Sequence, residues 1–363
     1  MSRLSLSSID QWDRWLLFAS LALALISALV MASAASSVNP RLAIRHWTWM
    51  GIGIMICWGL ANTDYRRWLD LSILVYGVSL IVLAIVPVAG AMRLGATRWL
   101  SLFGLSLQPS EFAKLSTIWM LARYLSGQPR PLSGQVIGIS LLLAGLPALM
   151  VFSQPDLGSA SIFGAIWLGM IWVAGASRRT LLSVAATGTV LLPIGWHLLK
   201  GYQRDRLLAF IDPHADPLGT GFSIIQSTIA IGSGQWWGRG WFAGTQNQLR
   251  FLPERHSDFI FSVIGEEWGF LGSVAVIMVF ALLVMRILRI AQRMTDPQAS
   301  LVATGVGAWL GYQTFVNIGM VMGVLPVVGV PLPFMSYGGS SMVTVWIALG
   351  LLHAMVRSAS AER

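Results

Sequence analysis

The sequence contains little charge and almost no cysteine. Charged residues make up 11% of the 363 positions, whereas 55% are hydrophobic, a balance that excludes a water-soluble globule of this length. The single cysteine, Cys57, excludes an intrachain disulfide and a cysteine-based metal site. Because Cys57 lies within an apolar run, we expect a small buried side chain there. The composition therefore predicts a polytopic membrane protein.

Motifs for several common chemistries are also absent. The chain has no GxxxxGKS/T phosphate loop and no GxSxG nucleophile elbow, so ATP-driven and serine-hydrolase functions are disfavoured. The five histidines show no metal-ligand spacing, which predicts no metal site built from them. The formal net charge of +9 comes from short clusters between apolar runs. It therefore indicates contact with anionic membrane lipids or an anionic lipid-linked substrate, not with nucleic acid.

Apolar runs of membrane-spanning length recur along the chain. A transmembrane helix needs about 20 apolar residues, and no cleavable signal precedes the first run, which should remain as the first helix. The sequence predicts an all-α polytopic membrane protein of about ten transmembrane helices in one domain, residues 1–363. The expected spans are 15–35, 47–62, 68–88, 108–126, 134–152, 157–176, 180–200, 259–285, 300–322 and 338–357.

The arginines set the expected orientation. With a cytoplasmic N-terminus, both termini face the cytoplasm and the one large loop, residues 201–258 between the seventh and eighth spans, is extracytoplasmic. Its Trp236, Trp237 and Trp241 suit a membrane interface, so we expect short helices along the outer leaflet. Positive charge beside span ends marks the cytoplasmic side, and in this orientation that side holds Arg14, Arg66, Arg67, Arg123, Arg130, Arg178, Arg179, Arg286, Arg289, Arg293 and Arg357.

Three carboxylates lie at the outer starts of expected spans. Glu111 begins the fourth, Asp156 the sixth and Asp258 the eighth. Ionisable groups at such positions are costly and are functional candidates. Because three separate elements deliver a carboxylate to one side, the sequence predicts an outward-facing polar site.

Each of these residues also has a structural interpretation. Asp258 is the best general base, since partial burial raises the pKa of a carboxylate, but it could instead cap its helix. Lys114 follows Glu111 by three residues, so the two form an ion pair that either neutralises both charges or positions a catalytic group. For Asp156, which follows Pro155, helix capping is favoured over catalysis.

Two further polar groups flank these candidates. Glu266 and Glu267 lie about 12 Å along the helix from Asp258 at 1.5 Å per residue, so we expect them to make polar bonds between helices or an ion pair. Before the tenth span, the run GVPLPFMSYGGSSM offers Ser336 and Ser340 as hydroxyl donors to phosphate, with helix capping as the alternative.

Five motifs, in the same order, resemble one known family. They are GATRWLSLFGLSLQPSEFAKL (95–115), SQPDLGSA (153–160), DPLGTGFSIIQSTIAIGSG (216–234), FLPERHSDFIFSVIGEEWGFLG (251–272) and LPVVGVPLPFMSYGGSS (325–341). Together they resemble the SEDS proteins (shape, elongation, division and sporulation) of bacterial cell-wall growth. The stretch 244–259 is more similar to the elongation members than to the division members. Ser257 stands where the family usually has Thr, and Trp268 where it usually has Leu.

The resemblance implies a peptidoglycan glycosyltransferase. Such an enzyme polymerises lipid II into β-1,4-linked glycan strands, with inversion, at the outer face of the bacterial cytoplasmic (inner) membrane. The implied partners are a class B penicillin-binding protein, which supplies the transpeptidase, and the elongation machinery. No nucleotide is implied, because the leaving pyrophosphate provides the driving force.

The resemblance also assigns residues. The family's essential aspartate falls on Asp258, within HSDF, and its charged pair falls on Glu111 and Lys114. Asp258 would then deprotonate the acceptor hydroxyl. A divalent cation, Mg²⁺ or Mn²⁺, could share the binding of the leaving pyrophosphate with the expected cationic partners Arg98, Arg204, Arg206, Arg250 and Arg255.

Two other classes of function remain open from the sequence. Intramembrane charges such as Glu111 and Lys114 would also suit a transporter that moves lipid II across the bilayer. A non-catalytic scaffold for the wall machinery is the third reading, and it accounts poorly for three outward carboxylates.

Overall fold

Long helices account for most of the fold. The computed structural model describes residues 13–36, 39–93, 96–102, 105–249, 251–252 and 254–361. Each of the ten expected spans overlaps one long helix in this part of the chain: α1 (Arg14–Ser36), α2 (Arg41–Ala61), α4 (Ser72–Ala89), α5 (Pro109–Ser126), α6 (Gly134–Ser153), α7 (Leu157–Ala174), α8 (Arg178–Leu198), α12 (Ile260–Arg293), α13 (Pro297–Val321) and α14 (Gly339–Ala361).

Local sequence signals explain where several of these helices begin. The side chains of Ser133, Asp156, Ser177 and Asp296 each accept a hydrogen bond from a backbone N–H in the first turn of the helix that follows. A proline stands at the start of α5 and α13, where its missing N–H costs no helical hydrogen bond. In the described chain six helices are long and apolar enough to cross a membrane: α1, α6, α7, α8, α12 and α14.

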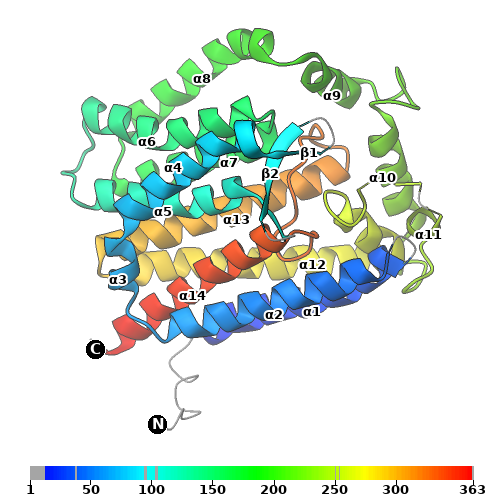
Figure 1. Cartoon of the computed structure of the whole chain (residues 1–363), viewed down its shortest axis with the longest axis horizontal. Coiled ribbons are helices and arrows are strands. Elements are labelled where there is room, and N and C mark those ends of the chain that lie inside the picture. Colours follow the sequence, from blue (N-terminus) through cyan, green and yellow to red (C-terminus); the bar gives the residue numbers. More distant parts are fainter. Residues whose placement is uncertain are drawn as a thin grey trace.

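The helices form one bundle around a buried centre. Helix α14 packs against α2, α12 against α1 and α13, and α7 against α6 and α13, as Figure 1 shows. The bulkiest fully buried side chains include Trp309 of α13 and Trp346 of α14. Helix α8 lies at the edge of the bundle, and no residue of its apolar stretch is buried.

The expectation of an all-α chain is wrong for residues 91–107. This segment forms a three-stranded antiparallel sheet of β1 (Ala91–Arg93), β2 (Ala96–Leu102) and β3 (Leu105–Leu107), in that order. In the registers, Arg93 pairs with Ala96 and Leu102 with Leu105. Runs of only three to seven residues are too short to span a membrane as helices, so local strand pairing satisfies their backbone groups.

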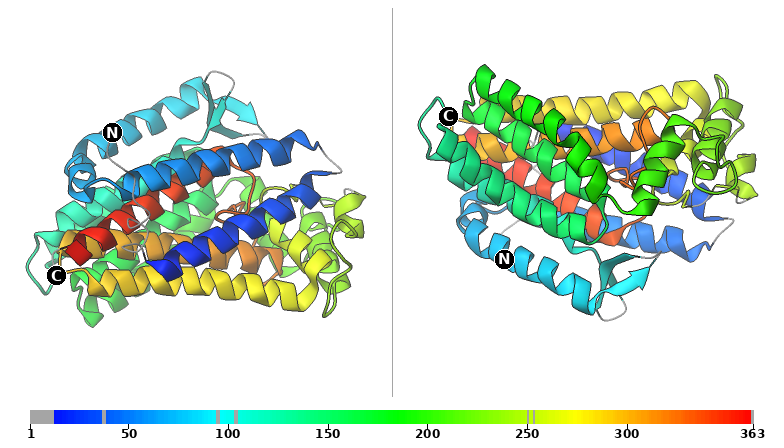
Figure 2. Two further views of the ribbon diagram at one scale, coloured as in Figure 1. Left: turned by 90° about the horizontal axis from the view of Figure 1, so that it is seen from below. Right: turned by 90° about the horizontal axis from the view of Figure 1, so that it is seen from above.

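The long connection before α12 contains three helices. They are α9 (Gly201–Ile211), α10 (Phe222–Ser233) and α11 (Thr245–Gln248). They gather at the end of the bundle away from the C-terminal end of α14, and the small sheet lies toward that same end (Figures 1 and 2). A short helix, α3 (Tyr65–Asp70), lies between α2 and α4 in the sequence.

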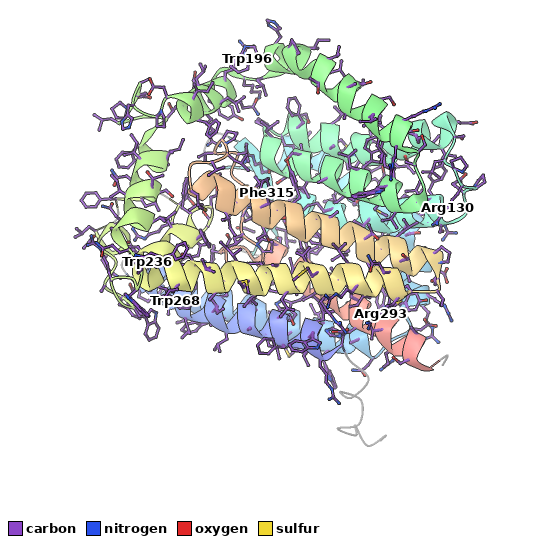
Figure 3. All side chains as sticks on the ribbon, turned by 180° about the vertical axis from the view of Figure 1, so that it is seen from behind. Arg130, Trp196, Trp236, Trp268, Arg293 and Phe315 are labelled. Atoms are coloured by element: carbon purple, nitrogen blue, oxygen red, sulfur yellow. The ribbon has the colours of Figure 1, made fainter. Side chains whose placement is uncertain are left out.

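Helix α12 differs from the single span expected at 259–285. It continues to Arg293 and is interrupted at Gly269, whose backbone is non-helical with φ 68° and ψ −161°. Figure 3 places Trp268, just before the interruption, near Trp236 and far from Arg293. The turn that carries Glu266 and Glu267 therefore does not continue the axis of the longer part of α12.

Candidate active site

The carboxylate of Asp258 faces a glycine in the loop that precedes α14. Gly329 has φ +71°, and a Cβ built on it would lie 3.4 Å from Asp258 Oδ2 and 3.9 Å from Arg206 Nη1. A glycine suits the positive φ here, whereas a Cβ would meet both side chains only at ordinary van der Waals distance. The carboxylate of Asp258 and the guanidinium of Arg206 on α9 thus meet at one point of the loop.

Burial and charge both act on Asp258. Desolvation of the partly buried carboxyl raises its pKa to about 6, and the negative charges of Glu254 and Asp156 add to the increase. The cations of Arg206 and Arg98 oppose it. Because a general base works best with a pKa near the operating pH, Asp258 is suited to accept a proton and is mostly ionised at pH 7.

A small pocket opens beside Arg206, and Asp258 itself is not among the residues that line it. Its wall includes Arg98, Tyr202, Arg206 and Val328, the residue before Gly329. The Arg206 guanidinium lies 5.9 Å from the centre of the Tyr202 ring, and two arginines give the pocket a positive potential. Planar guanidinium groups suit the forked binding of phosphate oxygens.

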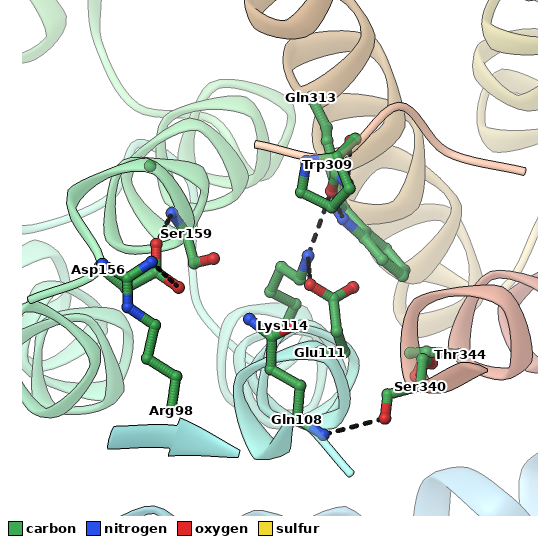
Figure 4. Close-up of polar contacts among 12 residues, drawn as sticks. Arg98, Gln108, Glu111, Lys114, Asp156, Ser159, Trp309, Gln313, Ser340 and Thr344 are labelled. Atoms are coloured by element: carbon green, nitrogen blue, oxygen red, sulfur yellow. Dashed lines mark hydrogen bonds and ion pairs between the residues drawn. The ribbon is translucent and has the colours of Figure 1, made fainter. Parts of the chain in front are cut away.

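Asp156 fixes one side of this pocket. Its Oδ1 accepts a hydrogen bond of 3.0 Å from the backbone N–H of Ser159, so the predicted helix cap is confirmed. Its Oδ2 lies 3.9 Å from Arg98 Nη1 (Figure 4). Arg98 also donates to the backbone carbonyls of Gln154 and Pro155. Asp156 therefore holds the start of α7 and the Arg98 side chain together.

The predicted ion pair of Glu111 and Lys114 is confirmed. Lys114 Nζ lies 2.8 Å from Glu111 Oε1, and both side chains have 0% exposure. The ammonium also donates to Gln313 Oε1 at 3.1 Å and lies 5.1 Å from the centre of the Trp309 ring (Figure 4). The pair is not among the residues that line the pocket. It contacts the site only through other side chains.

Other predicted cationic partners have different surroundings. Arg204 donates to the carbonyls of Trp196 and His197 at the end of α8. Arg255 is 2% exposed and donates to the carbonyl of Ala34. Arg250 lies outside the described residues. The pocket therefore brings together Arg98 and Arg206 from the predicted set.

Both predicted serines hold neighbouring chain segments. Ser336 Oγ donates to the carbonyl of Ser257 at 2.6 Å and accepts from the N–H of Leu332 at 2.7 Å. Ser340 Oγ accepts from the N–H of Gln108 at 2.9 Å. Each serine is buried. Phosphate binding by these hydroxyls stays a prediction, and the geometry favours a structural role.

The paired glutamates join the loop to the bundle. Glu267 accepts from Ser33 of α1, which confirms the predicted polar bond between helices. Glu266 accepts from the backbone N–H groups of Gln246 and Asn247 around α11. No group of three or more His, Cys, Asp or Glu that could hold a metal ion occurs among the described residues.

Sequence reasoning did not identify two amides on α13. Gln313 and Asn317 are fully buried and bind the loop around Gly329. The only available signal was a pair of amide side chains four residues apart in an otherwise apolar run. A neutral amide carries no charge, so its burial in an apolar run does not mark it as a functional candidate in the way that a buried carboxylate is marked.

Comparisons with known proteins give a consistent result. The family model for the cell cycle proteins FtsW, RodA and SpoVE matches residues 11–361. The peptidoglycan glycosyltransferase MrdB of Escherichia coli (strain K12) is 40% identical over 341 residues, covering 94% of this chain and 92% of that protein. The stage V sporulation protein E of Bacillus subtilis (strain 168) is 35% identical, with 85% of each chain covered.

Solved structures show the same fold. One chain of a peptidoglycan synthase complex, described for its coordination of polymerization and crosslinking, matches with a TM-score of 0.83 and 35% identity over 96% of this chain and 98% of that one. The rod shape determining protein RodA of Thermus thermophilus matches with a TM-score of 0.72 and 30% identity, covering 96% of this chain and 97% of that one.

Proposed function

The chain belongs to the family of cell cycle proteins represented by FtsW, RodA and SpoVE, and from this premise we infer that it is a peptidoglycan glycosyltransferase with Asp258 as its general base. It is a multi-pass membrane protein with several helices apolar enough to span a bilayer. The relatives named as glycosyltransferases cover most of its length. We place it in the bacterial cytoplasmic membrane, with about ten spans and the site on the outer side.

One observation carries the assignment of Asp258. Its pKa is raised to about 6 mainly by burial, and its carboxylate lies near Gly329 together with Arg206, which lines a pocket with Arg98. A base and an anion-binding wall are what a transfer from a pyrophosphate-linked sugar requires. The proposed substrate is lipid II, a disaccharide-peptide on undecaprenyl pyrophosphate.

The proposed step transfers the growing strand to a new acceptor. Asp258 removes the proton from the 4-hydroxyl of an acceptor GlcNAc, and the oxygen forms a bond to the anomeric carbon of the donor MurNAc. The bond from that carbon to the pyrophosphate oxygen breaks, so undecaprenyl pyrophosphate leaves and the configuration inverts. Arg98 and Arg206 stabilise the charge that develops on the leaving group. A divalent cation could share that binding.

Two finer assignments follow from the neighbours. The solved relative in a complex that coordinates polymerization and crosslinking supports a class B penicillin-binding protein as partner. The similarity to MrdB and RodA supports a role in elongation over one in division. Transport of lipid II is not favoured, because Glu111 and Lys114 neutralise each other in a fully buried position.

The deciding experiment is Asp258→Asn in the full chain, purified with its partner and assayed for glycan strands from lipid II in detergent. We expect a loss of about 100-fold or more, since general bases contribute roughly 10² to 10⁴. Asp205→Asn is the matched control, because Asp205 is exposed on α9. Full activity in Asp258→Asn would refute the assignment, whereas an inactive wild type would revive transport.

Loss of folding would not explain the expected result. The pKa of Asp258 is higher in the folded protein than the ordinary value of 3.8, so its ionisation above pH 6 destabilises the fold. Asp258→Asn removes that ionisation. We therefore expect the thermal midpoint of the variant at pH 7.5 to equal or exceed that of the wild type.

A further inference from the structure

Two buried amides of α13 hold the backbone around Asp258. Gln313 and Asn317 lie one helical turn apart, and both have 0% exposure. Gln313 Nε2 donates to the carbonyl of Pro331 at 2.8 Å. Asn317 Nδ2 donates to the carbonyl of Val330 at 2.7 Å and to the carbonyl of Asp258 at 2.8 Å.

The bonds of Asn317 join the two segments that meet at the carboxylate. One bond fixes the backbone of Asp258, and the other fixes Val330, the neighbour of Gly329. Gly329 in turn is the residue that the Asp258 carboxylate faces, at 3.4 Å from its Cβ position. The Asn317 side chain therefore holds the backbone of Asp258 and the loop around Gly329 next to each other.

Gln313 extends this connection to the buried ion pair. Its Oε1 accepts from Lys114 Nζ at 3.1 Å and from Trp309 Nε1 at 2.6 Å, while its Nε2 holds Pro331. A continuous path thus runs from Glu111 and Lys114 through Gln313 to the loop, and from the loop through Asn317 to Asp258 (Figure 4 shows its first part).

The energetics indicate that these amides serve the loop. A buried amide without partners costs about 1–3 kcal/mol in protein mutational data, and the bonded donors offset part of that cost, while Asn317 Oδ1 has no hydrogen-bond partner in the described structure. Both side chains donate their N–H groups to backbone carbonyls outside α13. Helix packing alone could be achieved by leucine or methionine at the same volume.

We propose that Gln313 and Asn317 are positioning residues, which orient Asp258 for proton transfer and couple its position to the buried Glu111–Lys114 pair through the backbone of Val330 and Pro331. This proposal rests on the proposed role of Asp258 as base. Both amides are fully buried and therefore not accessible to substrate.

Loss of positioning should change the chemical step more than binding. Misplacement of a reacting group by about 1 Å can cost roughly 100-fold. We expect kcat to fall by about 10- to 100-fold in Asn317→Leu, with the KM for lipid II changed less than about threefold, because Arg98 and Arg206 remain in the pocket. A released loop also admits water, so the acid limb of the pH–rate profile should move to lower pH.

The test uses the full chain with its partner. Asn317→Leu keeps the volume and removes both donations, and Gln313→Glu keeps the acceptor for Lys114 and Trp309 while losing the donor to Pro331. Thr314→Val is the matched control, because Thr314 is buried on the same helix and its hydroxyl has no hydrogen-bond partner in the described structure. If Asn317→Leu does not fold, Gln313→Glu decides through kcat and KM alone, because its added negative charge would itself move the acid limb.

A kcat for Asn317→Leu or Gln313→Glu within twofold of that of Thr314→Val would overturn the proposal. For Asn317→Leu, a lower kcat with an unchanged acid limb would also overturn the proposal, because a smaller folded fraction alone explains that result. These outcomes are distinct from failure of the base assignment, which would appear as activity in Asp258→Asn. An inactive Asp258→Asn beside a fully active Asn317→Leu would refute the positioning role alone.

Discussion

At the scale of single residues, Asp258 is governed by a competition between burial and nearby charges. Desolvation, Glu254 and Asp156 raise its pKa to about 6, and Arg206 and Arg98 lower it. The active form of a general base is the ionised one. The protonated fraction therefore grows as the pH falls through 6, and the rate should fall with it.

This predicts opposite shifts for two charge-removing variants. Glu254→Gln removes a charge that raises the pKa of Asp258, so the acid limb of the pH–rate profile should move to lower pH. Arg206→Gln removes a charge that lowers it, so the limb should move to higher pH, with a larger KM as well. Initial rates of lipid II polymerisation between pH 5 and 8 would measure both.

The direction of each shift is the decisive result. A glutamine at 254 can still accept from Ser257, as Glu254 does, so the first variant changes charge and little else. Shifts of the same sign in both variants, or an acid limb that stays fixed, would mean that a group other than Asp258 controls the profile.

At the scale of elements, the interruption of α12 is closed by the chain before it. Phe270 N–H donates to the carbonyl of Gln235 at 2.7 Å, and Leu271 N–H to that of Trp236 at 3.2 Å. In return, the backbone N–H of Arg239 donates to the carbonyl of Glu266 at 3.0 Å. These bonds satisfy backbone groups that a broken helix would leave unpaired. The loop after α10 thus supplies hydrogen-bond partners for the backbone of α12 at its interruption.

Gly269→Ala should therefore destabilise the protein. A Cβ at this position would lie 2.3 Å from the backbone nitrogen of Gly238, and the φ of 68° is unfavourable for alanine. We expect the free energy of unfolding to fall by about 2 kcal/mol or more, measured by thermal unfolding in detergent. Gly164→Ala is the control, because Gly164 is helical and nothing lies within 4 Å of its Cβ position. An unchanged thermal midpoint for Gly269→Ala would show that the loop around Gly238 can move away from the new Cβ without loss of stability.

The sequence predicted long helices well and the connections poorly. Hydrophobic runs and caps such as Asp156 located the ten long helices, because burial in an apolar environment depends on composition alone. The small sheet at 91–107 and the break at Gly269 depend on pairing with distant backbone. Asp258 was found from its charge, whereas Asn317 acts through two carbonyls that no sequence pattern reveals.

At the scale of the whole molecule, the site lies at one end of the bundle. Helices α9 to α11 and the start of α12 gather there, and the C-terminal end of α14 lies at the other end (Figures 1 and 2). Arg130 and Arg293, both expected in the cytoplasm, both lie toward the end opposite Trp236 (Figure 3). The position of these two arginines agrees with the positive-inside rule for an outward-facing site, which stays a prediction.

The orientation can be tested with single cysteines. The chain has one cysteine, Cys57, which is buried, so Cys57→Ala gives a silent background. We expect a membrane-impermeant maleimide to label Leu218→Cys, a position with 88% exposure, in intact spheroplasts. Arg179→Cys, also exposed, should react only after the membrane is opened, because positive charge beside span ends is retained in the cytoplasm. Labelling of Arg179→Cys in intact spheroplasts would invert the topology and place Asp258 on the side where no outward lipid-linked donor could reach it.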